Sequence, residues 1–366
     1  MKYTIVDSHV HLYPESHLPT LAWHKPGNPI GGQYSIDQYR LAAKKVPTGD
    51  QKSDDGEPYT LRGFVYLEVD RKSSVNEADG GWKHVLDEVS FLARIINGEP
   101  TPGEGHKPED SELCLGVVPW APVPAGQETM QRYMTLVQER MGTEKAWRKV
   151  RGVRYLVQDK PAGTMLGDGF VESLKWLGRE KLVFDLGVDA RQGGLHQLRE
   201  AVELCRRVYD GVKDDEKVVI VINHMCKPNH RVPYSGRESI ISHPEFNEWK
   251  QYVSAMAAAG PTTYMKLSGQ FTELPPLPAE PEPDYDSLAE RLEPWTDVIF
   301  DAFGPARVMF GSDWPVCNTG GGGQSAWERW RQVVQRVLDR RGLTEEEKQG
   351  FWGKVAVTAY GLDADI

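Results

Sequence analysis

The chain has few cysteines and no long apolar run, and each shortage excludes a class of protein. Its cysteines number four, at Cys114, Cys205, Cys226 and Cys317, and no two of them form a C-x-x-C pair. Cysteines spaced this widely build neither a disulfide framework nor a structural zinc site, so we expect reduced thiols. No apolar segment approaches the roughly 20 residues that a membrane-spanning helix needs. We therefore expect no membrane association.

The chain also lacks a block of basic residues. Its formal net charge is -10, from 43 Lys and Arg against 53 Asp and Glu. Nucleic acids and anionic membranes are bound by clustered Lys and Arg, so we expect neither as a partner. The composition, 39% hydrophobic and 26% charged, is that of an ordinary globular protein. Met1 and Lys2 lead directly into an apolar segment with no room for a signal peptide, which predicts a cytoplasmic protein.

What the chain does have is a regular alternation of short apolar segments and amphipathic helical ones. Such alternation is typical of parallel strands joined by right-handed crossovers, and eight units close into a (β/α)8 TIM barrel. An open doubly wound sheet is the alternative, but its Gly-rich phosphate turn is replaced here by His-Leu-Tyr-Pro after the first strand. We predict one domain over residues 1–366, with strands at 4–11, 63–69, 113–120, 150–157, 182–188, 218–224, 263–268 and 307–313.

Several connecting segments carry their own expectations. Long loops at 12–36, 225–243 and 271–286 should lie over the C-terminal face of the barrel and shape its pocket. Within the last of them, the Pro- and Glu-rich segment 274–284 is predicted to be an exposed flap. The glycine run 320–323 lacks the Lys and Ser/Thr of a phosphate loop, which favours a mobile connector. A single helix is expected over 344–360.

Polar side chains stand at the C-terminal ends of most predicted strands, where barrels of this kind build their active sites. Buried polar groups are costly unless they have partners, so their recurrence at matching strand ends indicates a site rather than packing. Because alternate side chains of a strand share a face, Asp7, His9 and His11 should point the same way. The full set is His9, His11, Glu68, Arg154, Asp185, His224, Lys266, Ser268 and Asp313.

Five motifs together resemble the amidohydrolase superfamily, of the amidohydrolase-2 type, and within it the branch of sugar lactonases. They are Asp-Ser-His-Val-His (7–11), Arg-Gly-Val-Arg (151–154), Asn-His-Met-Cys-Lys-Pro (223–228), Met-Lys-Leu-Ser-Gly (265–269) and Phe-Gly-Ser-Asp-Trp-Pro (310–315). Two departures stand out. The fifth strand reads Phe184-Asp185-Leu186 where many two-metal relatives place histidine, with a carboxylated lysine nearby, which argues for one metal or none. Asn223 precedes His224 where an aspartate is expected.

The resemblance implies hydrolysis of a sugar 1,4-lactone, with L-rhamnono-1,4-lactone as the first candidate. This reaction needs an activated water, a polarised carbonyl and a stabilised oxyanion. Asp313 is our candidate general base, and a helix N-cap is its alternative. His9 and His11, with Glu68 as a possible third ligand and Asp313 near the open position, would bind one divalent ion, zinc as first choice. Relatives work with or without metal, and without one the histidines would polarise the carbonyl.

The remaining candidates have a structural alternative each. Arg154 suits a carbonyl or a hydroxyl pair, or an ion pair with Glu68 or Asp185. His224 would hold the substrate carbonyl or a metal, or be a satisfied barrel histidine. Lys266 would contact substrate or close a salt bridge across strands six to eight. Trp314 and Tyr155 would stack on a sugar ring or simply pack.

Two other functional classes stay open at this point, as does a homo-oligomeric assembly. Decarboxylases of aromatic or related carboxylic acids share the His-x-His motif and the aspartate after the eighth strand, so a metal-dependent decarboxylase is the alternative enzyme. A ligand-binding protein that keeps the barrel without catalysis is the alternative outside enzymes.

Overall fold

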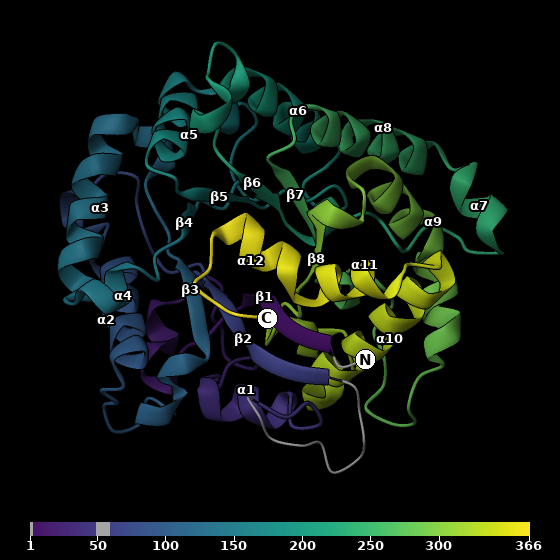
Figure 1. The fold of residues 1–366 in the computed structure, drawn as a ribbon, viewed down its shortest axis with the longest axis horizontal. Coiled ribbons are helices and arrows are strands. Elements are labelled where there is room, and N and C mark those ends of the chain that lie inside the picture. Colours follow the sequence, from purple (N-terminus) through teal and green to yellow (C-terminus); the bar gives the residue numbers. More distant parts are fainter. Residues whose placement is uncertain (1–2, 49–58) are drawn as a thin grey trace.

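In the computed structural model, which describes residues 3–48 and 59–366, eight parallel strands follow one another around a barrel (Figure 1). They pair in the order β1-β2-β3 and β4-β5-β6-β7-β8. Isolated parallel bridges join the two sheets, from Val117 to Val150 and from Val10 to Trp314. The predicted (β/α)8 barrel is therefore confirmed. The strands are β1 Tyr3–Val10, β2 Tyr59–Leu67, β3 Cys114–Val118, β4 Gly152–Arg154, β5 Val183–Leu186, β6 Ile220–Ile222, β7 Thr263–Leu267 and β8 Val308–Phe310.

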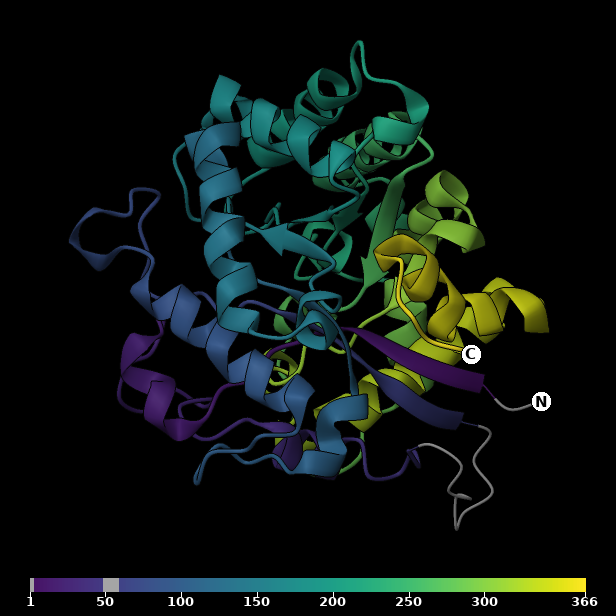
Figure 2. The same ribbon diagram turned by 60° about the vertical axis from the view of Figure 1, so that its left-hand side comes forward.

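Helices connect successive strands and surround the barrel (Figures 1 and 2). Helix α2 shows why: its buried residues Val85, Val89, Leu92 and Ile96 recur at helical spacing and face the strands. The helices are α1 Ile36–Ala42, α2 Lys83–Asn97, α3 Gln127–Met141, α4 Glu144–Trp147, α5 Asp168–Arg179, α6 His196–Tyr209, α7 Arg237–Ile241, α8 Pro244–Ala258, α9 Tyr285–Phe303, α10 Ala326–Arg341, α11 Glu345–Gln349 and α12 Val355–Tyr360. None of the described helices has the length and apolar character needed to cross a membrane.

Helix α12 closes one end of the barrel and crosses in front of the strands in Figure 1. Its side chains Val355, Ala356 and Ala359 pack in one cluster with interior residues of the strands, among them Val6 and Val221. The predicted helix over 344–360 is helical from Glu345 to Tyr360, but a π-helical turn that was not predicted, Gly350–Lys354, lies between α11 and α12. A Cβ on Gly353 would lie 2.6 Å from the carbonyl oxygen of Thr4, so the segment passes closely over the start of β1.

The glycine run 320–323 is packed rather than a loose connector, which corrects our expectation. A Cβ on Gly320 would overlap the backbone carbonyl of Phe271, and one on Gly322 would overlap the guanidinium of Arg329. Arg329 is fully buried and donates to the carbonyl oxygens of Pro278 and Ala279 at 2.8 and 2.6 Å. The glycines thus make room for an arginine that anchors the largely exposed flap.

The long loop after β1 is also anchored by an arginine. It contains a short 3-10 helix, Glu15–Thr20, which was not predicted. The buried Arg71 donates to Thr20 Oγ1 at 2.6 Å and contacts His17 Nδ1 at 3.0 Å, while its Nε lies 3.0 Å from Glu88 Oε1 on α2. This contact ties the loop to the helical layer and fixes its position over the barrel mouth.

Candidate active site

A cavity of about 410 Å³ lies at the C-terminal ends of the strands. A larger groove of about 890 Å³ lies elsewhere, among residues of α3, α5 and α12, and holds none of the predicted site residues. Of these two, the cavity at the strand ends is therefore the one that predicted site residues line. Its polar lining consists of His11, Asn28, Glu68, Asp70, Arg154, Gln158, Asn223, His224, Lys227, Asp313 and Thr319, and Tyr13 and Trp23 contribute aromatic rings from the loop after β1.

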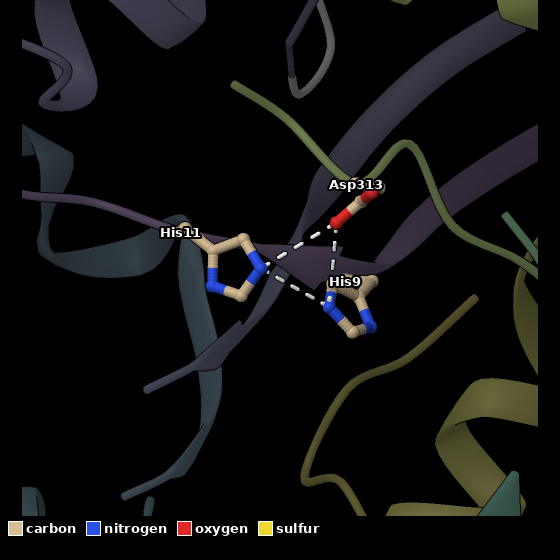
Figure 3. Close-up of side chains that lie close together, drawn as sticks. All are labelled: His9, His11 and Asp313. Carbon is tan, nitrogen blue, oxygen red and sulfur yellow. Dashed lines mark hydrogen bonds and ion pairs between the residues drawn. The ribbon is translucent and has the colours of Figure 1, made fainter. Parts of the chain in front are cut away.

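Three side chains from the two ends of the chain converge beside this cavity (Figure 3). The Nε2 atoms of His9 and His11 lie 3.2 Å apart, and they lie 3.6 and 3.5 Å from the same Asp313 carboxylate oxygen. Nε2 of His224 lies 3.8 Å from that oxygen. Hydrogen bonds of the backbone hold the group together: Asp313 N donates to His9 O at 3.0 Å, and His11 N donates to Trp314 O at 2.8 Å.

The surroundings set the charges of this group. Burial opposes ionisation of Asp313, but the neighbouring His224 and His11 outweigh it and hold the pKa of the carboxyl below its ordinary value. Burial lowers the pKa of His224 to about 3 and also lowers the pKa of His9 far below its ordinary value. The site therefore holds an ionised carboxylate facing two neutral imidazoles at neutral pH.

The donor set fits a divalent metal ion. One ligand atom each from His9, His11 and Asp313 lies within 4.8 Å of the others. Nδ1 of His11 lies 2.9 Å from the carbonyl oxygen of Leu67, an interaction that places the ring proton on Nδ1 and leaves Nε2 as a lone-pair donor. Glu68, predicted as a possible third ligand, is not a member of this group.

Asp7 does not share a face with His9 and His11, and this expectation is wrong. A register shift interrupts the pairing of β1 with β2 between Asp7 and Val10, so the alternation of side chains is broken. The Asp7 carboxylate instead accepts hydrogen bonds from Tyr39 Oη at 3.0 Å, Trp327 Nε1 at 2.9 Å and the backbone N of Ser312 at 2.8 Å. It thereby ties α1 and α10 to the segment that carries Asp313.

Arg154 and Glu68 face each other across the cavity wall. Arg154 Nε lies 3.0 Å from Glu68 Oε1, and Nη1 lies 3.4 Å from His9 Nε2. Burial raises the pKa of Glu68 to about 7, although the charge of Arg154 opposes this shift. Arg154 is placed for both of its predicted roles, because it pairs with Glu68 and also lines the cavity where a substrate would bind.

Lys266 of β7 forms a salt bridge, but its partner Asp185 lies on β5 and not on strands six to eight as predicted, and Lys266 does not line the cavity. Its Nζ donates to Asp185 Oδ1 at 2.7 Å and lies 3.2 Å from His9 Nδ1, and the side chain is fully buried. Burial lowers the pKa of Lys266 to about 8. Tyr360 of α12 donates to the other Asp185 oxygen at 2.6 Å. A buried chain of contacts thus runs from the closing helix to His9.

A left-handed turn follows β6 and presents His224 to the cavity. Four successive residues without a glycine, 224–227, have φ between 47° and 62°. This conformation costs about 1–2 kcal/mol per residue, so the surroundings must hold it. They do: Gln270 Nε2 donates to His224 O at 2.9 Å, Trp249 Nε1 donates to Met225 O at 2.9 Å, and Ala190 N donates to Cys226 O at 3.0 Å.

Two residues of the motif Met-Lys-Leu-Ser-Gly pack against the His224 ring. Ser268 Oγ lies 2.8 Å from His224 Nδ1. A Cβ on Gly269 would lie 2.6 Å from His224 Nδ1 and 3.1 Å from Asp313 Oδ2, so a glycine is required for both side chains to take these positions. Gly269 also has φ of 67°, a left-handed conformation that glycine adopts readily.

Two predicted sugar-stacking residues lie outside the cavity lining. Trp314 is buried between Tyr34 and Tyr39, with ring centroids at 5.5 and 5.4 Å. Tyr155 packs edge-on against Phe170 at 6.2 Å. The structure thus gives both rings packing partners, which was the alternative interpretation of each.

The cavity also includes residues that we did not predict as site members. Lys227 lines it three residues after His224, and Trp23 and Tyr13 line it from the loop after β1. Lys227 stands within the quoted motif 223–228, so that motif was the available signal. No periodicity marks Tyr13 or Trp23, because an irregular loop carries none.

Comparisons with known proteins identify the family of the chain. The family model described as Amidohydrolase matches residues 143–362. The chain belongs to the amidohydrolase family. It is 33% identical over 362 residues to the L-rhamnono-gamma-lactonase of Scheffersomyces stipitis, covering 99% of both chains. It is 28% identical over 220 residues to the L-fucono-1,5-lactonase of Burkholderia multivorans, covering 59% of this chain and 65% of that one.

Among solved structures, a zinc-bound amidohydrolase from Burkholderia multivorans has the same fold. It superposes with a TM-score of 0.68 at 23% identity, covering 98% of this chain and 99% of that one. A 2,6-dihydroxybenzoate decarboxylase from Rhizobium superposes with a TM-score of 0.53 at 10% identity, covering 100% of both. At these identities the likeness concerns the fold alone, and the barrel by itself does not choose between hydrolysis and decarboxylation.

Proposed function

We propose that this amidohydrolase opens a sugar 1,4-lactone to the aldonic acid, with L-rhamnono-1,4-lactone as the first substrate to test. The observation that carries the proposal is the Asp313 carboxyl, which is buried at the cavity among the imidazoles of His9, His11 and His224. The full-length similarity to a lactonase named for L-rhamnono-gamma-lactone supports the choice of substrate.

The proposed reaction uses Asp313 as the general base. Its carboxylate takes a proton from water as the water oxygen bonds to the lactone carbonyl carbon. The same proton then passes to the ring oxygen as the carbon–oxygen bond of the ring breaks, which leaves the aldonic acid. His224 and Arg154 face the cavity and would hold the carbonyl, because each offers an N–H to an oxygen that gains negative charge.

A divalent ion, for which we propose zinc, would be held by His9, His11 and Asp313. When bound, such an ion supplies Lewis acidity at the open coordination position. Glu68 would act on Arg154 rather than as a ligand, because its carboxylate faces the guanidinium at 3.0 Å. Metal analysis of protein purified without chelator, compared with a His9→Asn variant, tests this assignment: the variant should lose bound zinc, and equal zinc content would contradict it.

The test of the function is acid release from a panel of sugar lactones, with L-rhamnono-1,4-lactone, L-fucono-1,5-lactone and a simple aliphatic lactone at neutral pH. Turnover of at least one sugar lactone, above the rate without enzyme, is expected. Carbon dioxide release from 2,6-dihydroxybenzoate with no lactone turnover would overturn the proposal in favour of the decarboxylase alternative.

A further inference from the structure

Lys227 is a charged group of the cavity that the reaction described above does not use. It ends the left-handed turn that begins with His224, and both side chains line the same cavity. The carbonyl of Lys227 accepts from Arg191 N at 3.2 Å, and its own N donates to His224 O at 2.8 Å. The backbone that carries this lysine is therefore fixed at both ends.

The ammonium group of Lys227 keeps donor capacity for a ligand. An ammonium has three N–H donors. Among the described residues, Nζ donates to Gln158 Oε1 at 3.2 Å and faces Asp189 only at 3.8 Å, beyond hydrogen-bond distance. The other strong cation of the cavity wall, Arg154, is already paired with Glu68 at 3.0 Å. Lys227 thus keeps N–H donors for a ligand, because the carboxylate it faces lies beyond hydrogen-bond distance.

The proposed reaction creates negative charge in such a cavity. When water bonds to the neutral lactone carbonyl, the carbonyl oxygen becomes an oxyanion, and after the ring bond breaks the product carries a carboxylate. A cation that lies where this charge develops stabilises the transition state more than the neutral substrate. The ammonium need not gain or lose a proton for this role.

We propose that Lys227 binds the carboxyl end of the ligand, as the oxyanion during hydrolysis and as the carboxylate of the product. This inference rests on the proposed lactone hydrolysis and deepens it. It predicts that aldonates bind better than neutral polyols of the same carbon skeleton.

The test compares Lys227→Met and Lys227→Arg with a matched control, Lys160→Met. Lys160 pairs with Asp159 at 2.9 Å and is not part of the cavity lining. We expect Lys227→Met to lower kcat/KM for the lactone by about 100-fold, in line with the loss of one oxyanion donor. Lys227→Arg should recover part of this loss, and Lys160→Met should leave the rate unchanged.

A second readout separates ligand binding from a structural role. The inhibition constant of the aldonate product should rise about tenfold or more in Lys227→Met, while binding of the corresponding neutral alditol stays the same. Equal weakening of both ligands, or an unchanged kcat/KM, would overturn the inference while lactone hydrolysis by the wild type still stood.

If the wild type hydrolyses no lactone, the proposed function fails separately, and calorimetric titration with the aldonate decides the role of Lys227. Binding to the wild type that is lost in Lys227→Met supports the inference. Equal binding to both proteins, or none to the wild type, overturns it.

Discussion

Asp313 shows how a single side chain acquires its charge state from its neighbours. Burial by itself would favour the protonated carboxyl, yet three imidazoles lie within 3.8 Å of one carboxylate oxygen. Of these, His224 and His11 hold the pKa of the carboxyl below its ordinary value. The pairs Arg154–Glu68 and Lys266–Asp185 differ from Asp313, because in each pair a buried basic side chain faces a buried carboxylate.

The Lys266–Asp185 pair gives a prediction for stability. Lys266→Met leaves the Asp185 carboxylate buried with Tyr360 as its remaining side-chain donor among the described residues, so it should lower the free energy of unfolding by about 3–5 kcal/mol. The double variant Lys266→Met, Asp185→Asn removes the uncompensated charge and should recover part of that loss. Urea unfolding of the wild type and both variants measures this. A double variant no more stable than Lys266→Met would contradict the role of the pair.

For single residues, the sequence allowed us to predict the location of side chains at strand ends. It did not allow us to predict the location of side chains that depend on packing. His9, His11, His224 and Asp313 could be grouped because the C-terminal ends of barrel strands share one face. Trp314 could not be placed, because only the structure shows that Tyr34 and Tyr39 enclose it. The roles of all these residues in catalysis stay predictions.

The left-handed turn 224–227 and the loop that starts at Gly269 act together as one element. The turn has a strained backbone, and the hydrogen bonds from Gln270 and Trp249 hold it. No sequence rule predicts four left-handed residues in a row without glycine, because each would favour another conformation in isolation. The strand before the turn was easy to predict, while the turn itself depends on contacts from the segments that follow β5 and β7 and from α8.

Gly269→Ala tests this element. The added Cβ would come within 2.6 Å of His224 Nδ1, so the ring must move, and we expect kcat/KM to fall by about tenfold or more. Gly142→Ala is the matched control, because Gly142 has a similar φ of 70° and nothing within 4 Å of the added Cβ. Both variants should lose about 1–2 kcal/mol of stability to backbone strain. Equal activity of the two would contradict a positioning role for Gly269.

The number and the order of the strands were predicted correctly, whereas the residues at which they begin and end were predicted less accurately. The predicted strand 150–157 is only Gly152–Arg154 in the structure, because the chain leaves the sheet after Arg154 to form the cavity wall. The π-helical turn between α11 and α12 was not predicted, because such a turn keeps a helix-like sequence pattern.

The molecule as a whole buries several neutral imidazoles, and this makes its stability depend on pH. Burial lowers the pKa of His230 to about 3 and of His17 to about 4, whereas in the unfolded chain both titrate near 6.5. Between these values the unfolded state binds more protons than the folded state. Stability should therefore be retained above about pH 6.5 and fall as the pH is lowered toward the folded-state pKa values.

His230→Gln isolates one of these contributions. His230 is buried and its Nε2 lies 2.7 Å from Gln270 Oε1, so glutamine can keep a polar contact there. The variant should lose less stability than the wild type when the pH is lowered from about 6.5 to 4, since it lacks one proton-binding site of the unfolded state. Urea unfolding at a series of pH values gives the free energy of unfolding as a function of pH for the wild type and the variant. The same dependence on pH in both proteins would contradict the burial of a neutral His230.

The closed barrel, with α12 across one end and long loops over the other, leaves the Asp313 cavity as the place where the proposed chemistry occurs. The central claim is that Asp313 is the general base in lactone opening. The most direct measurement is kcat for L-rhamnono-1,4-lactone in the wild type, in Asp313→Asn and in Asp301→Asn, an exposed aspartate on α9 that serves as the control. We predict that Asp313→Asn lowers kcat by about 100-fold or more with unchanged unfolding, while the control keeps the wild-type rate. A folded Asp313→Asn enzyme with a kcat close to that of the wild type would contradict the account.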